Sequence, residues 1–250
     1  MFYAAKNLIE KGKTYMPEIV RSKYVRELEE LKQEVLKMGL FALDALKNAI
    51  MAFLSYSLDE ARKVIEQDVI VDRWEVDIDR RALNLLALEQ PVAKDLRLIV
   101  ACLRMNAEIE RIGDQAVNIA QRTVRLAKLP PVCQPPPFED LYKVAIEMVE
   151  KSLKCFADED VELARQVCAM DDEADNANFA VMRDSLTYMT NHPTCVEQAL
   201  QTVIVARCLE RSADIATNIA ENVIFIVEGK NVKHLFADKE KEKTKKHWDV

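Results

Sequence analysis

The sequence predicts an all-α fold made of two tandem three-helix bundles, and three features predict it. Glycine is rare, with four in 250 residues, whereas a β-rich chain of this size needs many turn glycines. The eight prolines leave long proline-free stretches that are rich in the helix-favouring residues alanine, leucine, glutamate and lysine. Two motifs also occur twice in the same order, which indicates an internal duplication.

The first half of the chain is predicted to hold three long helices. They are expected at about 23–56, 57–89 and 92–128. In the first, apolar residues recur at three- and four-residue steps, which marks one buried stripe. Ser57 and Glu60 form a capping-box pattern that begins the second, and Pro91 stops it. Short connections make consecutive helices antiparallel, so residues 23–128 are expected to form an up-down-up bundle.

The second half is predicted to repeat this arrangement. Residues 129–137 are rich in proline and are expected to form a semi-rigid extended linker. Helices then follow at about 138–156, 160–190 and 196–228. Pro193 is expected to interrupt the helical structure before the helix at 196–228, and Gly229 stands where the C-terminal cap of that helix is expected. Residues 138–229 therefore form the second predicted bundle.

The two ends of the chain differ in composition from the bundles. Residues 1–22 are expected to form an N-terminal extension, and a short amphipathic membrane anchor is the alternative interpretation. Residues 230–250 are strongly charged and are expected to form a solvated tail.

The overall composition excludes several classes of protein. The formal net charge is −7, which argues against a nucleic-acid-binding protein. We find no apolar run of about 18 residues and no signal peptide, so no transmembrane segment is expected. Six cysteines without a CxxC pair are interpreted as reduced, core-filling thiols of a cytoplasmic protein.

The duplication is visible at the level of single residues. The pattern AR-x-V-x-x-x-D-x-x-x-D occurs at 61–72 and again at 164–175, and ER-x-x-D-x-A-x-N-I-A occurs at 110–120 and at 210–220. The offset is 103 residues from Asp68 to Asp171 and 100 residues from Glu110 to Glu210. The turns around the prolines at 91 and 193 can absorb the difference.

Polar side chains form a line on the last two helices of each half. On the last helix the line contains Glu110, Asp114, Asn118 and Gln121 in the first half, and Glu210, Asp214, Asn218 and Glu221 in the second. On the preceding helix it contains Asp68, Asp72, Glu75 and Asp79, and then Asp171, Asp175, Asn178 and Met182. On the last helix the polar line lies well around the helix from the apolar stripe, so we interpret it as a face of the bundle and not as part of the core.

These acidic lines favour a metal site over an ordinary solvated face. Like charges four residues apart cost about 0.2–0.5 kcal/mol per pair, and no lysine or arginine stands at the i+4 positions to offset them. Carboxylates from two adjacent helices offer hard oxygen ligands suited to Mg²⁺, Ca²⁺, Mn²⁺ or ferric iron. A bound cation would turn the repulsion into attraction. A solvated acidic face without metal remains the alternative.

Several further side chains near the motifs are candidates for binding a metal ion or an anion. Additional candidate ligands are Glu75, Asn118, Asn218 and Glu221. Arg111 and Arg211 directly follow the motif glutamates, and each either forms a salt bridge, which we favour, or binds an anion such as phosphate.

Signatures of enzymes are absent from the sequence. No Glu-x-x-His motif is present to build a di-iron oxidase, and no phosphate-binding glycine loop or nucleophile elbow occurs. The histidines at 192, 234 and 247 lie in a turn and in the tail. We therefore expect no catalytic residues, and a metallo-hydrolase or oxidase is disfavoured.

The paired segments ERIGDQAVNIA (110–120) and ERSADIATNIA (210–220) resemble the PhoU family of phosphate-transport and phosphate-signalling accessory proteins. The D-x-x-x-D elements at 68–72 and 171–175 match the family's E(D)xxxD motif, and the resemblance covers about residues 23–236. It implies clusters of a metal, with iron, zinc, magnesium and manganese as candidates, on the acidic faces. By position, the implied ligands are Asp68, Asp72, Glu110 and Asp114, and Asp171, Asp175, Glu210 and Asp214.

The resemblance also implies a function. It predicts a negative regulator of the phosphate-starvation response that joins the ATPase subunit of a phosphate ABC transporter to a sensor histidine kinase. Such a protein is cytoplasmic or peripheral at the inner face of the membrane, and we expect a homo-oligomer, most simply a dimer. The alternative is a metal-free helical scaffold or adaptor that binds a phosphate carrier or another partner through its acidic faces.

Overall fold

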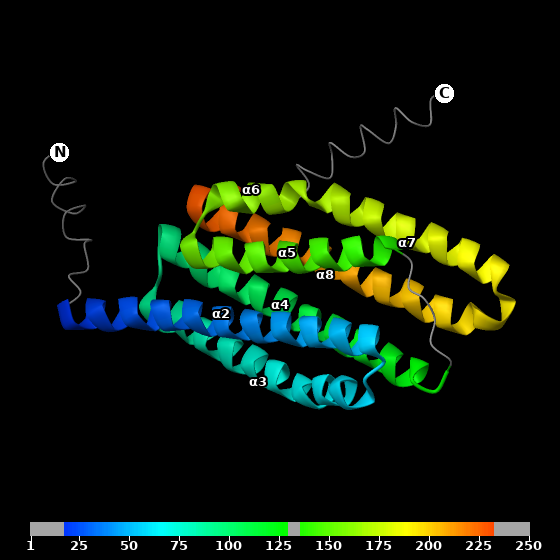
Figure 1. The fold of residues 1–250 in the computed structure, drawn as a ribbon. Helices are drawn as coiled ribbons and strands as arrows, with labels where there is room; N and C mark the ends of the chain where they lie inside the picture. The colour runs from blue at the N-terminus through cyan, green and yellow to red at the C-terminus, as the bar shows by residue number, and fades with distance from the viewer. Residues whose placement is uncertain (1–17, 130–135, 233–250) are drawn as a thin grey trace, which may run out of the picture.

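The computed structural model describes residues 18–129 and 136–232, and within these ranges it contains helices and no strand (Figure 1). The helices of the first bundle are α2 (Glu18–Ser55), α3 (Leu58–Glu89) and α4 (Ala93–Leu126). Those of the second are α5 (Pro136–Asp158), α6 (Val161–Ala169), α7 (Asp171–Asn191), the 3₁₀ turn η1 (Pro193–Cys195) and α8 (Val196–Glu228). The predicted all-α fold of two tandem bundles is confirmed.

The predicted helix caps are present, except that the reciprocal bond of the capping box is not formed: the N–H of Ser57 donates to the carbonyl of Ala52 (2.9 Å), and the carboxylate of Glu60 pairs with Lys63. Ser57 precedes α3, and its Oγ accepts a hydrogen bond of 3.4 Å from the backbone N–H of Glu60. Gly229 ends α8 in the left-handed conformation (φ 71°), which glycine adopts without a Cβ penalty. Its N–H donates to the carbonyl of Phe225 at 3.0 Å. Both helix ends could be predicted from the sequence because capping depends on a few local residues.

Two helices begin earlier than predicted. Helix α2 starts at Glu18, inside the predicted N-terminal extension, and α5 starts at Pro136, inside the predicted linker. Proline is tolerated in the first turn of a helix because its missing N–H would have no partner there. Residues 1–17, 130–135 and 233–250 lie outside the described residues, as do the predictions of an extension, an extended linker and a charged tail that fall on them.

The helix predicted at 160–190 is interrupted, and that prediction was wrong in this detail. Helix α6 ends at Ala169 and α7 begins at Asp171, with Met170 between them. The N–H of Met170 is shared between the carbonyls of Gln166 (3.2 Å) and Val167 (3.0 Å), as in a tightening helical turn. The three acidic residues that follow occupy the first turn of α7, where the helix dipole stabilises negative charge. The break therefore places the second acidic motif at a helix start.

The two bundles pack through α4 and α8, which run antiparallel at the centre of the molecule (Figure 1). Arg97 near the start of α4 donates from Nε to the carbonyl of Ile226 near the end of α8 (3.0 Å). Arg125 at the other end of α4 forms an ion pair of 3.0 Å with Glu197 at the start of α8. Helices α2 and α5 contact each other and pack on α4 and α8 respectively. Helices α3 and α7 pack on α4 and α8 in turn, so the motif carboxylates of each bundle lie along the contact between two adjacent helices.

Helix α2 is long and apolar enough, over residues 22–55, to cross a membrane by length and composition. Half of the apolar 18-residue window within this helix is buried inside the protein, and Leu31, Val35 and Met38 are fully buried. The buried apolar side chains of α2 face α3, α4 and α5, as in the core helix of a bundle, whereas Val25, Leu40 and Met51 are exposed.

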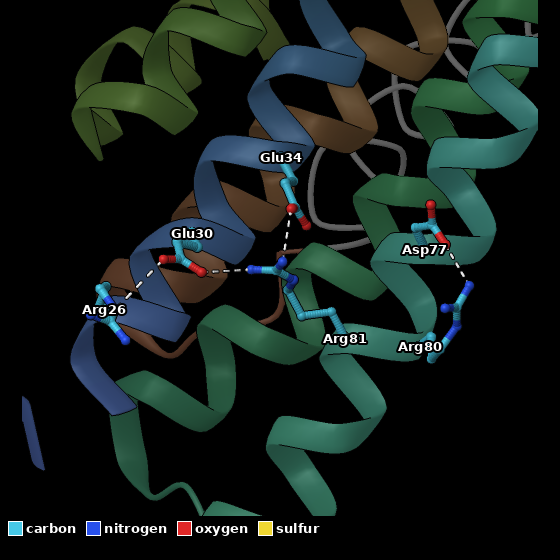
Figure 2. Close-up of polar contacts among 6 residues, drawn as sticks. All are labelled: Arg26, Glu30, Glu34, Asp77, Arg80 and Arg81. Carbon is cyan, nitrogen blue, oxygen red and sulfur yellow. Dashed lines mark hydrogen bonds and ion pairs between the residues drawn. The ribbon is translucent and has the colours of Figure 1, made fainter. Parts of the chain in front are cut away.

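Ion pairs join α3 to α2 on the outer side of the first bundle (Figure 2). Arg81 of α3 reaches two carboxylates of α2, Glu30 at 2.9 Å and Glu34 at 3.1 Å, whereas Arg80 pairs with Asp77 on its own helix. A groove of about 590 Å³ lies beside this cluster, and a second of about 760 Å³ lies between α2 and α5. Neither groove is lined by the motif carboxylates.

The described cysteines are free thiols, as predicted. Cys102, Cys155 and Cys168 are buried, and burial raises the pKa of each thiol to about 12. A thiol with such a pKa stays protonated and unreactive near neutral pH. These cysteines therefore act as small apolar residues of the core.

Candidate metal centres

The second repeat gathers three motif carboxylates into one cluster. Asp175 of α7 and Glu210 and Asp214 of α8 each offer a carboxylate oxygen, and these three oxygens lie within 4.8 Å of one another. The i,i+4 spacing puts Glu210 and Asp214 on the same face of α8, and the packing of α7 on α8 brings Asp175 to that face. The arrangement allows two helices to share one cation.

Glu210 is the most buried member of this cluster, with 7% of its surface exposed. Its Oε1 accepts a hydrogen bond of 3.1 Å from Nη1 of Arg207. Its Oε2 is buried and has no hydrogen-bond partner among the described residues. The prediction that this polar line lies wholly outside the core was therefore wrong for Glu210. A buried carboxylate oxygen without a partner is costly, and a cation at the cluster would satisfy it.

Asp171, the remaining ligand implied for this repeat, lies next to the cluster. Thr217 of α8 donates a hydrogen bond of 3.2 Å to its Oδ1. Burial raises the pKa of Asp171, and this hydrogen bond opposes the rise. Asp171 and Glu221 both act electrostatically on the thiol of Cys168 and help to raise its pKa.

Crowding of like charges is strong in the second cluster. The pKa of Asp214 rises to about 7, first because the group is desolvated and then because Glu210, Asp171 and Asp175 lie nearby. Arg207 partly opposes this rise. Near neutral pH the cluster therefore holds protons that a cation would displace.

The first repeat is less compact. Among the described residues, no three of Asp68, Asp72, Glu110 and Asp114 have carboxylate oxygens that all lie within 4.8 Å of one another. They do repel one another, because the pKa of Glu110 rises to about 7 through desolvation and then through Asp114, Glu75, Asp72 and Asp68. The helices approach closely here, since a Cβ built on Gly113 would lie 3.6 Å from Oδ1 of Asp68. The four carboxylates thus form one electrostatic group along the contact between α3 and α4, without three of their oxygens converging as in the second repeat.

Glu75 and Asp79 extend the first acidic groove along α3. Desolvation raises the pKa of Glu75, followed by repulsion from Asp79, Asp72 and Asp114, so Glu75 belongs to the same electrostatic group. Asp79 is held differently, because the buried Asn106 of α4 donates to its Oδ1 at 2.9 Å and to the carbonyl of Glu75 at 2.8 Å. This bridge is absent from the second repeat, where Met182 and Ala206 occupy the equivalent positions.

The remaining sequence candidates lie at the edges of the grooves. Asn118 and Asn218 are partly exposed, and the backbone carbonyl of Asn218 accepts from Asn222 at 2.9 Å. Arg111 forms an ion pair of 2.9 Å with Glu108 on its own helix, which is the salt bridge that we favoured over an anion site for this residue. Arg211 is exposed and stands one residue from Glu210.

The donor set fits a hard cation. Asp175, Glu210 and Asp214, with Asp171 beside them, would hold it in the second repeat, and Asp68, Asp72, Glu110 and Asp114 would hold it in the first. Carboxylate oxygens suit magnesium, manganese, calcium and iron. The unpartnered Oε2 of Glu210 is the structural observation that supports this fit. The cation would supply charge neutralisation that draws α7 and α8, or α3 and α4, together.

Three residues that contribute to these sites were missed in the sequence. Arg207 pairs with Glu210, Thr217 donates to Asp171, and Asn106 holds Asp79. Only Arg207 had a usable signal, because it precedes Glu210 by three residues and side chains at i,i+3 are neighbours on a helix. The other two act between helices, and no spacing rule along one helix finds them.

A duplicated all-helical bundle with motif carboxylates on two adjacent helices of each copy defines a helical repeat protein whose candidate ligands lie on neighbouring helices. The family comparison agrees with this class. A family model described as the PhoU domain matches residues 35–123 and 138–223. The chain belongs to the PhoU family.

Relatives and solved structures support the family assignment. A phosphate-specific transport system accessory protein PhoU homolog from Aquifex aeolicus is 37% identical over 212 residues, covering 85% of this chain and 96% of the relative. A homolog from Xylella fastidiosa is 35% identical, covering 88% and 90%. The crystal structure of PhoU from Pseudomonas aeruginosa is similar with a TM-score of 0.78 and 31% identity, covering 83% of this chain and 100% of that one. These names describe an accessory protein of transport and none of them names an enzyme.

Proposed function

We propose that this chain is an accessory protein of phosphate-specific transport that binds metal and regulates phosphate uptake and phosphate-starvation signalling. Family membership and the names of the relatives support the assignment to phosphate transport. The observation that supports metal binding is the cluster of Asp175, Glu210 and Asp214, with a buried Glu210 oxygen that lacks a partner.

The proposed regulatory role couples two partners. The chain binds the ATPase subunit of a phosphate ABC transporter and a sensor histidine kinase, and it represses the starvation response when phosphate is abundant. This places it in the cytoplasm or at the inner face of the membrane, and it acts as a homo-oligomer, most simply a dimer. The acidic grooves serve as cation-dependent clamps that fix the helix pairs on which partners dock.

The regulatory proposal is tested in a strain that lacks the gene for this chain. We expect phosphate-starvation genes to be expressed at high phosphate, and a plasmid copy of the chain to restore repression. We also expect the transporter ATPase subunit to co-purify with the chain. Normal repression in the deletion strain, with no co-purification, would contradict the proposal.

The metal proposal is tested by elemental analysis of the purified chain. We expect stoichiometric metal in the wild type, a lower content in Asp114→Asn and in Asp214→Asn, and almost none in the double variant. Asp77→Asn is the matched control, because Asp77 is an exposed acidic residue of α3 that pairs with Arg80 on the same helix. It should keep the wild-type metal content.

The second candidate function is a metal-free helical adaptor. Two observations favour it: the first four carboxylates do not converge on one point, and Arg207 already supplies a positive charge to Glu210. This alternative predicts no stoichiometric metal in any variant and partner binding that survives Asp114→Asn and Asp214→Asn.

A further inference from the structure

The two acidic grooves differ at the residue that stands three positions before the motif glutamate. The second repeat has Arg207 there, and the first repeat has Ala107. The two positions are equivalent, because Glu110 and Glu210 are related by the same offset of 100 residues. Arg207 therefore adds a positive charge beside the acidic motif of the second repeat, and the motif residues themselves are the same in both repeats.

Arg207 neutralises the second groove from inside the chain. Its Nη1 lies 3.1 Å from Oε1 of Glu210, and its charge lowers the pKa of Asp175 and of Asp214 against the effects of burial and repulsion. Its side chain is 56% exposed, whereas that of Glu210 is 10% exposed. The guanidinium thus reaches the cluster from the solvent side and has space to move away.

In the described part of the chain, Glu110 of the first repeat has no counterpart to the Arg207 ion pair of Glu210. Among residues 18–129 and 136–232, no lysine or arginine forms an ion pair with Glu110, and the charges that act on its pKa all raise it. Arg111, the nearest arginine in sequence, is paired with Glu108 instead. Glu75 and Asp79 add further negative charge here, at positions that Asn178 and Met182 occupy in the second repeat.

The compactness of each groove follows the same division. Three carboxylate oxygens lie within 4.8 Å of one another in the repeat that contains Arg207, and no such group of three is found among the described residues of the repeat that contains Ala107. A positive charge beside Glu210 reduces the repulsion that would otherwise separate Asp175 and Asp214 from it. At the same time it leaves Oε2 of Glu210 without a partner. Arg207 therefore satisfies half of this carboxylate.

We propose that Arg207 is a built-in counter-ion of the second acidic site, which must release Glu210 before a metal ion binds there. The two sites then load at different metal concentrations, the first site at the lower concentration and the second at the higher. This inference rests on the proposed function, in that it requires metal binding to both grooves.

The test measures Mn²⁺ binding to the full-length, metal-free chain by calorimetry, one site at a time. Glu110→Gln with Asp114→Asn isolates the second site, and Glu210→Gln with Asp214→Asn isolates the first. In the double variant that isolates the second site, Arg207→Ala should tighten Mn²⁺ binding about tenfold. The substitution removes a partly screened positive charge that repels the ion.

The reciprocal change provides the matched comparison. Ala107→Arg in the background that isolates the first site should weaken Mn²⁺ binding about tenfold, for the same reason with the opposite sign. Ala107 is exposed, so an arginine fits without disturbing the core. Arg211→Ala removes a neighbouring charge without an ion pair to Glu210 and should change the affinity less than Arg207→Ala does.

The outcomes separate the two proposals. Mn²⁺ binding that is unchanged by both Arg207→Ala and Ala107→Arg would overturn the role of Arg207 and leave metal binding intact. An equal effect of Arg211→Ala would also overturn it, because net charge alone would then explain the result. No Mn²⁺ binding in the wild type or in any folded variant would overturn the metal part of the proposed function itself.

Discussion

In the first repeat, the acidic groove of α3 and α4 carries carboxylates along both helices, and Asn106 bridges part of it. In the second repeat, α7 and α8 carry fewer carboxylates in this line, Arg207 supplies a positive charge to Glu210, and Thr217 donates a hydrogen bond to Asp171. The motif positions are the same in both. The comparison teaches that duplication kept the carboxylates and that neighbouring positions determine how their repulsion is balanced.

The largest effect is expected at the Asn106 bridge. Asn106→Ala should destabilise the fold by about 2 kcal/mol, because Asp79 and the carbonyl of Glu75 lose their donor inside the protein. Urea denaturation at neutral pH measures the change. Adding Asp79→Met recreates the Met182–Ala206 pair of the second repeat and should recover most of the loss. If stability does not recover in the double variant, the Met–Ala pair of the second repeat cannot replace the Asp79–Asn106 pair of the first.

A smaller effect is expected from pH. Glu110 and Asp214 have folded-state pKa values of about 7, above the ordinary carboxyl value, so the folded state binds their protons more tightly than the unfolded state does. These groups impose no penalty below about pH 4. Their penalty grows as pH rises toward 7 and is complete above it. The metal-free chain should therefore lose stability from pH 5 to pH 8.

Asp214→Asn tests this pH dependence. It should stabilise the metal-free chain at pH 8 by about 1 kcal/mol, a figure reduced for solvent screening because Asp214 is an exposed side chain. It should have little effect at pH 4. Thermal unfolding in the presence of a chelator provides the measurement. Equal effects at both pH values would contradict the assigned pKa.

The hydrogen bond of Thr217 should have a modest effect. Thr217→Val installs the residue that the first repeat has at 117 and should destabilise the chain by about 0.7 kcal/mol through loss of the bond to Asp171. Val117→Thr is the reverse control and should not cost stability. Denaturation curves of the two variants measure their free energies of unfolding. Equal stability of wild type and Thr217→Val would show that this hydrogen bond does not stabilise the chain.

The smallest effect is expected at Gly113. Gly113→Ala should stabilise the chain by about 0.5 kcal/mol, because alanine favours the helix and its Cβ would meet Val71 and Asp68 at ordinary contact distances of 3.5 and 3.6 Å. The second repeat already has Ala213 there. A loss of stability in denaturation experiments would mean that α3 and α4 are closer than described.

Most of the fold was predictable because its signals are local. The capping pattern at Ser57, the breaks at Pro91 and Pro193 and the glycine at 229 each act within one turn of a helix. The duplication then gave the architecture of the second half from that of the first. The interruption at Met170 was not predictable, because its flanking residues favour helix on both sides and only the dipole preference of the acidic run marks the new start.

The candidate sites were predictable in part. The i,i+4 spacing places Glu210 and Asp214 on one face of a helix, but it cannot say how closely a carboxylate on the neighbouring helix approaches them. It also gives no warning that Glu210 is buried. Burial and convergence depend on how two helices pack, which is a property of the whole bundle and not of either helix.

The most direct test of the account is a crystal structure of the Mn²⁺-loaded chain, with anomalous scattering used to locate the metal. The account predicts anomalous peaks in both grooves, within coordination distance of Asp175, Glu210 and Asp214 in one and of Glu110 and Asp114 in the other. In the second groove, the guanidinium of Arg207 should have left Glu210. Manganese-soaked crystals with no peak in either groove, and with Arg207 still paired to Glu210, would contradict it.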